Sequence, residues 1–319
     1  MKLVMIEHDG KPTSGCLIDD EVVIFALASN LMPSALAVPG TVAGIVDEDA
    51  GGLAAAFRFL DDLSNANDNM KSELRSAGAI RTIRNTQLLP PLSRAQNIWA
   101  HGGGYVSHLR DFDPEVKFAK SASHPPTGFS KSSTAIIGPG DEIRIPSLAP
   151  DFVDFEGEFG VVFGRECHEV SREEAMEYVA GFTIVNDISA RDWVIKKDIE
   201  PFKRGAMYIM YKNFSTFCPI GPNVTTKDEI DDYKGIRLTT KLNGKLMQEA
   251  TLDNMIWDIP ELIERYSAII RFMPGDVLST GTPGGVGVGR TPPVFMKNGD
   301  VVSVAIEGIG ELRNPIVGP

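Results

Sequence analysis

The stretch Asp154-Phe155-Glu156-Gly157-Glu158-Phe159-Gly160-Val161-Val162-Phe163-Gly164 has the two-residue alternation that is typical of a β-strand. With this period Asp154, Glu156 and Glu158 lie on one face and the first two phenylalanines on the other. Like charges that are buried together either take up protons or bind a cation. One interpretation is therefore a divalent metal site. The other is an exposed polar face on a half-buried strand, and the stretch alone leaves both open.

The overall composition bounds the class of protein. The chain has 319 residues and a formal net charge of -12, which argues against a nucleic-acid surface. The sequence shows no signal-type segment and no apolar run of membrane-spanning length. Three cysteines, Cys16, Cys167 and Cys218, have neither redox nor ligand spacing. We therefore expect a cytoplasmic protein with reduced thiols, bound to neither nucleic acid nor membrane.

Two domains are predicted, because Pro90-Pro91 interrupts regular structure. Residues 1–92 are expected to form a small α+β domain, and residues 93–319 a larger, mainly β domain. In the first, strands are expected at Met1–Ile6 and Cys16–Phe25, and helices at Leu53–Leu63 and Met70–Ala77. In the second, Gly-Asp turns precede the β-rich runs Ile143–Ile145, Val277–Ser279 and Val301–Ile306. Helices are expected from Ser171 and over Ile259–Phe272.

A further carboxylate follows the predicted strand Gly181–Val185. Asp187 can complete an oxygen ligand set with Glu156 and Glu158, which suits Mg²⁺, Mn²⁺ or Ca²⁺ better than Zn²⁺. Alternatively, Asp187 or Ser189 caps a helix over Ala190–Lys197. For Asp187 the two interpretations are evenly balanced, whereas for Ser189 the cap is preferred.

Three other segments carry candidate polar groups. If a helix begins near Tyr105, His108 and Asp111 share one of its faces and form a general base, although a surface pair is the commoner case. The loop Ser279–Thr291 presents backbone NH groups and the Thr282 hydroxyl, or is a plain flexible turn. Lys212 precedes an apolar run and either supplies a cation for an anionic substrate or is solvated.

The order of these segments, from Ile98 to Pro315, resembles that of the fumarylacetoacetate hydrolase family. The matching segments are Tyr105–Asp111, Asp154–Glu158, Gly181–Asp192, Lys212–Pro222, Leu242–Gln248, Met273–Gly287 and Asn298–Gly310. The resemblance implies a mixed β-roll catalytic domain and a homodimer. It places metal ligands at Glu156, Glu158 and Asp187, and a water-activating dyad at His108 and Asp111. Substrate contacts fall on Tyr105, Arg191, Lys212, Gly281 and Thr282.

This chain departs from the family pattern at three positions in or next to these segments. Relatives often carry Glu where this chain has Asp111, Gln where it has Val194, and Asn where it has Gly104. The shorter carboxylate arm at position 111 affects the dyad geometry. The apolar side chain at position 194 removes a hydrogen-bond partner for the substrate.

The resemblance implies an enzyme of 2-oxo or 1,3-dicarbonyl acids that uses Mg²⁺ or Mn²⁺, with Ca²⁺ as a further candidate. Our main expectation is hydrolysis of a C–C bond in an acylpyruvate-type acid, such as a fumarylpyruvate- or fumarylacetoacetate-like compound. Lys212 would stabilise the oxyanion. The alternative is decarboxylation or isomerisation of an oxaloacetate- or hydroxymuconate-like acid at the same site, and a third is a non-catalytic binding protein. The loop Phe112–Lys131 is expected to be irregular and to shape the pocket.

Overall fold

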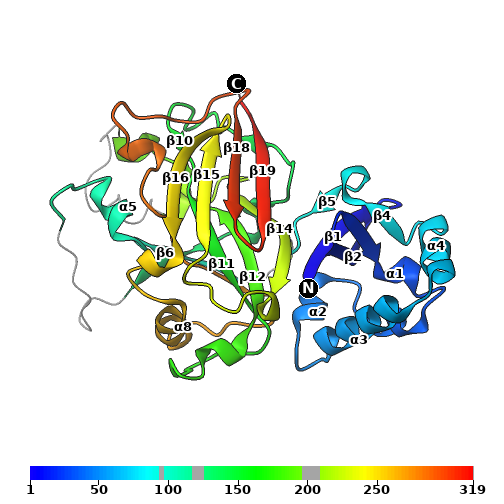
Figure 1. The fold of residues 1–319 in the computed structure, drawn as a ribbon. Coiled ribbons are helices and arrows are strands. Elements are labelled where there is room, and N and C mark those ends of the chain that lie inside the picture. Colours follow the sequence, from blue (N-terminus) through cyan, green and yellow to red (C-terminus); the bar gives the residue numbers. More distant parts are fainter. Residues whose placement is uncertain (93–96, 117–125, 196–208, 319) are drawn as a thin grey trace.

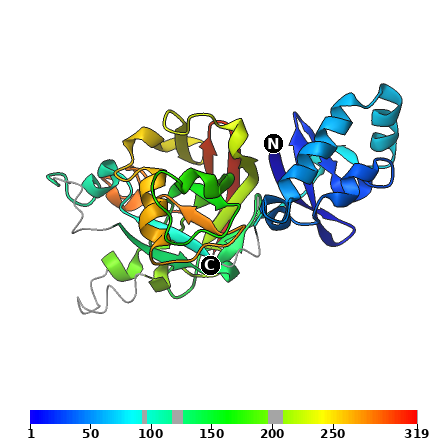
Figure 2. The same ribbon diagram turned by 90° about the horizontal axis from the view of Figure 1, so that it is seen from below.

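The computed structural model describes residues 1–92, 97–116, 126–195 and 209–318. Residues 1–92 lie together at one side of the larger second part (Figures 1 and 2). Their strands are β1 (Lys2–His8), β2 (Lys11–Ile18), β3 (Glu21–Ile24), β4 (Ile80–Thr82) and β5 (Leu88–Leu89). Their helices are α1 (Phe25–Ala28), α2 (Val42–Val46), α3 (Gly52–Asn65) and α4 (Asp68–Ser76), with 3₁₀ turns at Pro33–Ala37 and Ile83–Asn85.

The large sheet continues from this first part into the second, in the order β4-β3-β2-β1-β14-β12-β11-β17-β6-β7. Its further members are β14 (Cys218–Thr226), β12 (Val179–Asn186), β11 (Gly157–Phe163), β17 (Val277–Ser279), β6 (Ile98–Gly102), β7 (Thr127–Lys131) and β8 (Ile136–Ile137). Strand β1 pairs with β14 through Lys2 opposite Thr225 and Leu3 opposite Val224. The predicted boundary near residue 92 therefore separates two groups of elements that share one sheet, and as a domain boundary it stays a prediction.

A second sheet has the order β16-β15-β18-β19-β9 and contacts β11 and β12 (Figure 1). Its strands are β16 (Lys245–Thr251), β15 (Arg237–Leu242), β18 (Val301–Ile306), β19 (Gly310–Val317) and β9 (Ile143–Arg144). Strand β10 (Val153–Asp154) pairs with β13 (Ser189–Ala190), and the helices are α5 (Val106–Arg110), α6 (Asp192–Ile195) and α8 (Ile259–Ser267). Further 3₁₀ turns are Ser133–Ala135, Ala175–Tyr178, Lys227–Glu229, Leu252–Asn254 and Gly287–Gly289. The mainly β, α+β fold class with mixed sheets is confirmed.

Every residue of β11 is buried, because both of its faces are covered. Phe159 and Phe163 pack in a core that includes Phe182 and Leu262 of α8. The ring of Phe163 stacks on Phe272 with centroids 4.3 Å apart. Burial of each such side chain contributes about 1.5–3 kcal/mol. This packing fixes the central strands, and therefore the residues at their ends, in position.

The three Gly-Asp turns share one local structure. Gly140, Gly275 and Gly299 have φ between 82° and 88°, which only glycine adopts without strain. In each turn the following aspartate accepts a hydrogen bond from the backbone NH three residues before it. Asp276 also accepts from the NH of Asn97, at 2.9 Å, and so holds the start of β6 beside β17.

Several sequence-based element predictions were wrong in detail. The run Cys16–Phe25 is two strands, because Asp19 turns the chain with φ 52°. The expected helix from Ser171 is only the 3₁₀ turn Ala175–Tyr178, since the Ser171 hydroxyl bonds to the Glu174 side chain instead of capping a backbone NH. Helix α8 ends at Ser267, five residues before Phe272. Ser189 lies in β13 and caps no helix, while α6 begins at Asp192.

Candidate active site

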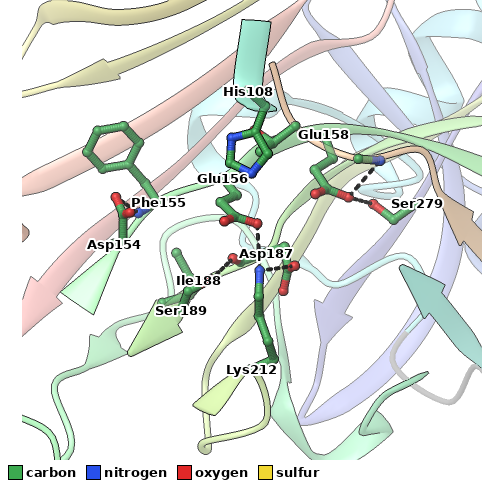
Figure 3. A network of polar contacts seen from close by, with 12 residues as sticks. His108, Asp154, Phe155, Glu156, Glu158, Asp187, Ile188, Ser189, Lys212 and Ser279 are labelled. Carbon is green, nitrogen blue, oxygen red and sulfur yellow. Dashed lines mark hydrogen bonds and ion pairs between the residues drawn. The ribbon is translucent and has the colours of Figure 1, made fainter. Parts of the chain in front are cut away.

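The three predicted ligands meet where β11 begins and β12 ends. Gly157 pairs with Asn186 in the antiparallel ladder, so Glu156 and Asp187 lie just beyond adjacent strand ends. The NH of Asp187 donates to the Glu156 carbonyl at 2.8 Å, and the Glu156 NH donates to Oδ1 of Asn186 at 3.0 Å. Glu158 is on β11 itself. One oxygen from each carboxylate lies within 4.8 Å of the others, and all three side chains are buried (Figure 3).

The stretch Asp154–Gly164, predicted as one strand, is therefore not continuous. Strand β10 ends at Asp154, and β11 begins at Gly157, with Glu156 between them. The break separates Asp154 from the metal-type cluster. Its carboxylate accepts hydrogen bonds from the backbone NH groups of Gly287, at 2.7 Å, and Val288, at 3.1 Å. It also pairs with Nε of Arg191 at 3.1 Å, which gives the buried carboxylate a cationic partner.

Two buried lysines approach the carboxylates. Lys212 Nζ lies 2.6 Å from Glu156 Oε2 and 2.6 Å from Asp187 Oδ2 (Figure 3). Lys131 Nζ lies 2.7 Å from Asp187 Oδ1 and donates to the backbone carbonyl of Lys212. Lys212 is thus a site residue rather than a solvated one. Lys131 was missed, because it belongs to the segment expected to be an irregular loop; the alternation Phe129-x-Lys131 at the end of β7 was the available signal.

The carboxylates differ in their ionisation. Burial raises the pKa of Glu158 well above its usual range, and the neighbouring Asp187 and Glu156 raise it further. Burial also acts to raise the pKa of Glu156, but Lys212, Arg191 and His108 outweigh it, so the pKa is lowered. Arg191 pairs with Glu156 as well as Asp154. Glu158 is thus the carboxylate whose charge the protein balances least.

This donor set fits a hard divalent cation. All three ligands are carboxylate oxygens, as Mg²⁺ and Mn²⁺ prefer. The Lys212 ammonium, itself a cation, lies between two of them. Glu158 Oε2 accepts from the Ser279 hydroxyl at 2.5 Å and from the Gly281 NH at 3.2 Å. Among the described residues no hydrogen bond reaches Oε1, which leaves that oxygen for a metal ion.

His108 lies close to the carboxylates, on α5 (Figure 3). Its Nδ1 is 3.7 Å from Asp111 Oδ2, so the predicted pair shares a helix face, as expected for residues three apart. This distance is too long for a hydrogen bond. Asp111 Oδ2 instead accepts from the Gly285 NH at 2.8 Å. Within the described part of the chain, His108 Nδ1 is buried without a hydrogen-bond partner.

The predicted substrate contacts are largely engaged with the protein itself. The Thr282 hydroxyl donates to the Gly157 carbonyl at 3.0 Å and accepts from Gln248 Nε2 at 2.8 Å. Gly281 donates its NH to Glu158. Tyr105 is the residue before α5, and burial raises the pKa of its phenol, whose oxygen is among the buried polar atoms without a described partner. Val194 lies in α6, but its side chain is outside what the structure describes.

A pocket opens on this cluster. It is lined by Gly102, Gly103, Phe129 and Thr282, with two histidines, the three carboxylates and Lys212. One histidine is His108. The other is His101, which was not among the residues selected from the sequence. A small anionic molecule held here would contact carboxylates, an ammonium group and two imidazoles, a combination that suits metal-assisted proton transfer.

Comparison with known proteins decides the family. Residues 97–317 match the model of the fumarylacetoacetate (FAA) hydrolase C-terminal domain. The chain belongs to the fumarylacetoacetate hydrolase family. It is 33% identical over 318 residues to the oxaloacetate tautomerase YisK of Bacillus subtilis, covering 99% of this chain and 100% of that protein. It is 38% identical over 259 residues to the mitochondrial oxaloacetate tautomerase fahd2 of Xenopus laevis, covering 81% and 77%.

Solved structures of the family share this fold. A 5-carboxymethyl-2-hydroxymuconate delta-isomerase from Mycobacterium smegmatis has a TM-score of 0.70 and 29% identity, with 100% of this chain and 99% of that chain covered. A fumarylacetoacetate hydrolase from Exiguobacterium antarcticum has a TM-score of 0.76 and 26% identity, with 100% of both chains covered. The named activities of these family members include tautomerisation, isomerisation and hydrolysis. Among the described residues, no helix is long and apolar enough to cross a bilayer.

Proposed function

We propose that this protein is a metal-dependent tautomerase of a small 2-oxo acid of the oxaloacetate type, interconverting its keto and enol forms. This is the isomerase branch of our alternative expectation. The names of the similar curated proteins support it. So does the His108–Asp111 distance of 3.7 Å, which is the observation that carries the proposal. Water attack on a carbonyl needs a base that is polarised strongly, whereas enolisation needs only an imidazole that takes up and returns a proton.

The chain's own residues divide the work. Glu156, Glu158 and Asp187 would hold Mg²⁺ or Mn²⁺, which supplies Lewis-acid polarisation of the 2-oxo oxygen when bound. His108 takes the proton from C3 as the C3–H bond breaks, and the electron pair forms the C2–C3 double bond. The C2–O π pair moves onto oxygen, where the cationic Lys212 stabilises the negative charge until the His108 imidazolium gives its proton to that oxygen. Reversal of these steps gives the keto form.

A substrate panel tests the proposal. Purified protein with Mn²⁺ is mixed with oxaloacetate, and the enol form is followed by its ultraviolet absorbance while pyruvate formation reports decarboxylation. Accelerated tautomerisation without accelerated pyruvate formation is the expected result. His108→Gln should lose this acceleration but bind Mn²⁺ as the parent does. A tautomerisation rate that is the same with and without the parent protein would overturn the proposal.

Hydrolysis of an acylpyruvate is the second candidate, because His108 and Asp111 do share a helix face beside the pocket. An acylpyruvate in the same panel separates the two: rapid release of pyruvate and a carboxylic acid would favour hydrolysis. The metal's identity, the cytoplasmic location and the homodimer stay predictions.

A further inference from the structure

His101, at the end of β6, is the second imidazole of the pocket, and the proton transfer proposed above does not use it. Its side chain is buried, with 3% exposure. A Cβ atom placed on Gly104 would lie 3.3 Å from His101 Cδ2 and 3.2 Å from Gly281 Cα. The NH of Gly281 donates to Glu158. The Cδ2 side of the His101 ring, where Nε2 also lies, is therefore close to the Glu158 end of the pocket.

The hydrogen bonds of the opposite nitrogen fix the tautomer of His101. Nδ1 lies 3.0 Å from the Thr127 carbonyl oxygen and 2.8 Å from the Tyr266 hydroxyl oxygen. The Tyr266 hydroxyl donates to the same carbonyl, at 2.9 Å. Since a carbonyl only accepts, the network is consistent when Nδ1 carries the proton. Nε2 is then left with a bare lone pair, and it is buried without a partner among the described residues.

This lone pair has a definite chemical preference. Burial lowers the pKa of His101 to about 4, so the ring is neutral at physiological pH. A neutral acceptor attracts an O–H donor and repels carboxylate and carbonyl oxygens. A buried acceptor without a donor costs stability, so a donor is expected when a ligand fills the pocket. The keto form of a 2-oxo acid offers no hydroxyl at C2, whereas the enol form does.

We propose that His101 is a specificity-determining residue whose Nε2 accepts a hydrogen bond from the hydroxyl of an enol or 2-hydroxy acid in the pocket, an assignment that rests on the proposed function. It gives the enol form a contact that the keto form lacks. The departure at Gly104 agrees with this role. Any side chain there would meet His101 and the Thr280 carbonyl oxygen, the latter 2.5 Å from the added Cβ. Glycine at position 104 therefore leaves room for the His101 ring.

Two substitutions separate the acceptor from the anchor. In His101→Asn the amide nitrogen takes the place of Nδ1 and can donate to Thr127, but nothing reaches the position of Nε2. In His101→Gln an amide reaches that position and the anchor is lost. Tyr266→Phe is the matched control, because it removes a hydroxyl that contacts Nδ1 and leaves Nε2 intact.

The probes are malate, as both enantiomers, and succinate, which differ by one C2 hydroxyl and do not tautomerise. Each is titrated calorimetrically into Mn²⁺-loaded protein. His101→Asn should weaken binding of the preferred malate about tenfold, as expected for loss of one hydrogen bond, and change succinate binding less than about twofold. His101→Gln should retain part of the preference for malate. Tyr266→Phe should keep the ratio of malate to succinate affinity.

The outcomes are distinguishable. An unchanged malate-to-succinate ratio in His101→Asn overturns the assignment, and so does an equal loss of both affinities, which indicates a purely structural role. If His101→Asn does not fold, His101→Leu, which also carries no acceptor, replaces it, and a malate-to-succinate ratio in His101→Leu equal to that of the Tyr266→Phe control overturns the assignment instead. Mn²⁺ binding is measured on the same samples by electron paramagnetic resonance. Parent protein that binds neither Mn²⁺ nor either acid overturns the proposed function, and the role of His101 with it.

Discussion

Lys212→Met is the substitution that most directly probes the charge balance of the site. Lys212 is 1% exposed, and its ammonium forms ion pairs of 2.6 Å with both Glu156 and Asp187. Methionine has a similar length and no charge. The change therefore deletes one cation from the carboxylate cluster with little loss of side-chain volume.

The loss of unfolding free energy depends on which cations still pair with Glu156 and Asp187. Removing one partner of a buried ion pair typically costs about 3–5 kcal/mol. Here Glu156 keeps Arg191 and Asp187 keeps Lys131, so neither carboxylate is left without a cation. We therefore expect a loss near the lower limit, about 3 kcal/mol, when divalent metal is absent. A bound metal ion stabilises both proteins, so it narrows the deficit only by as much as it binds the variant more tightly. If loss of the competing ammonium tightens Mn²⁺ binding about tenfold, the deficit narrows by about 1.4 kcal/mol.

Urea denaturation with EDTA and with Mn²⁺ measures both quantities. The Lys212→Met deficit should be about 3 kcal/mol in EDTA and shrink to about 1.6 kcal/mol in saturating Mn²⁺. Lys227→Met is the control, since Lys227 is 43% exposed and lies 3.7 Å from Glu48; its deficit should stay below about 1 kcal/mol in both buffers. A Lys212→Met deficit that is as small as the control's, or that Mn²⁺ leaves unchanged, would refute the reasoning.

Three further predictions concern the pocket and its supports. Burial raises the pKa of Glu158, and its carboxyl must lose a proton to bind metal at any pH below that pKa, so Mn²⁺ affinity should rise about tenfold per pH unit over that range. Glu158→Gln should abolish this slope and weaken binding at least about tenfold, as calorimetry in several buffers would show; pH-independent Mn²⁺ affinity in the parent protein would contradict this. Asp111→Asn should lower kcat less than about tenfold, because its carboxylate lies 3.7 Å from His108 Nδ1 and forms no hydrogen bond to it. His108→Ala should lower kcat about 10²–10⁴-fold, because it removes the general base. Equal losses of kcat in steady-state kinetics would show that the two residues act as a catalytic dyad. Gly104→Ala should lower the free energy of unfolding in urea by about 1–3 kcal/mol, because the new Cβ would lie 2.5 Å from the Thr280 carbonyl oxygen. An unchanged free energy of unfolding would show that the backbone shifts to accommodate the methyl group.

Local patterns in the sequence predicted the strands and helices that depend on neighbouring residues. Val277–Ser279 and Val301–Ile306 were placed with the observed bounds, and α3 within two residues at each end, because alternation and helical spacing are local properties. The break between β10 and β11 could not be seen in the same way. It follows from hydrogen bonds between Glu156 and the end of β12, thirty residues away.

The site was predicted where polar residues and family resemblance coincided, and His108 and Lys212 line the pocket together with the predicted carboxylates. Glu156, Glu158 and Asp187 do come together, within 4.8 Å, as the resemblance implied. The pairing of β7 with β6 brings Lys131 to Asp187 and places His101 in the lining of the pocket. The alternation Phe129-x-Lys131 indicates at most that Lys131 shares a strand face with Phe129, and His101 has no comparable signal, so only the strand register brings the two side chains to the site.

The shared sheet has a consequence for how the chain folds. Leu3 and Phe59 of the first part belong to the same apolar core as Val162, Val185 and Ile220 of the second. A fragment limited to residues 97–317, the part that matches the family model, would lose the residues that 1–92 contribute to that core and would expose the edge of β14 that pairs with β1. Exposed edges and apolar patches promote aggregation. We therefore expect residues 97–317 to depend on residues 1–92 for folding, and truncated expression should give insoluble material.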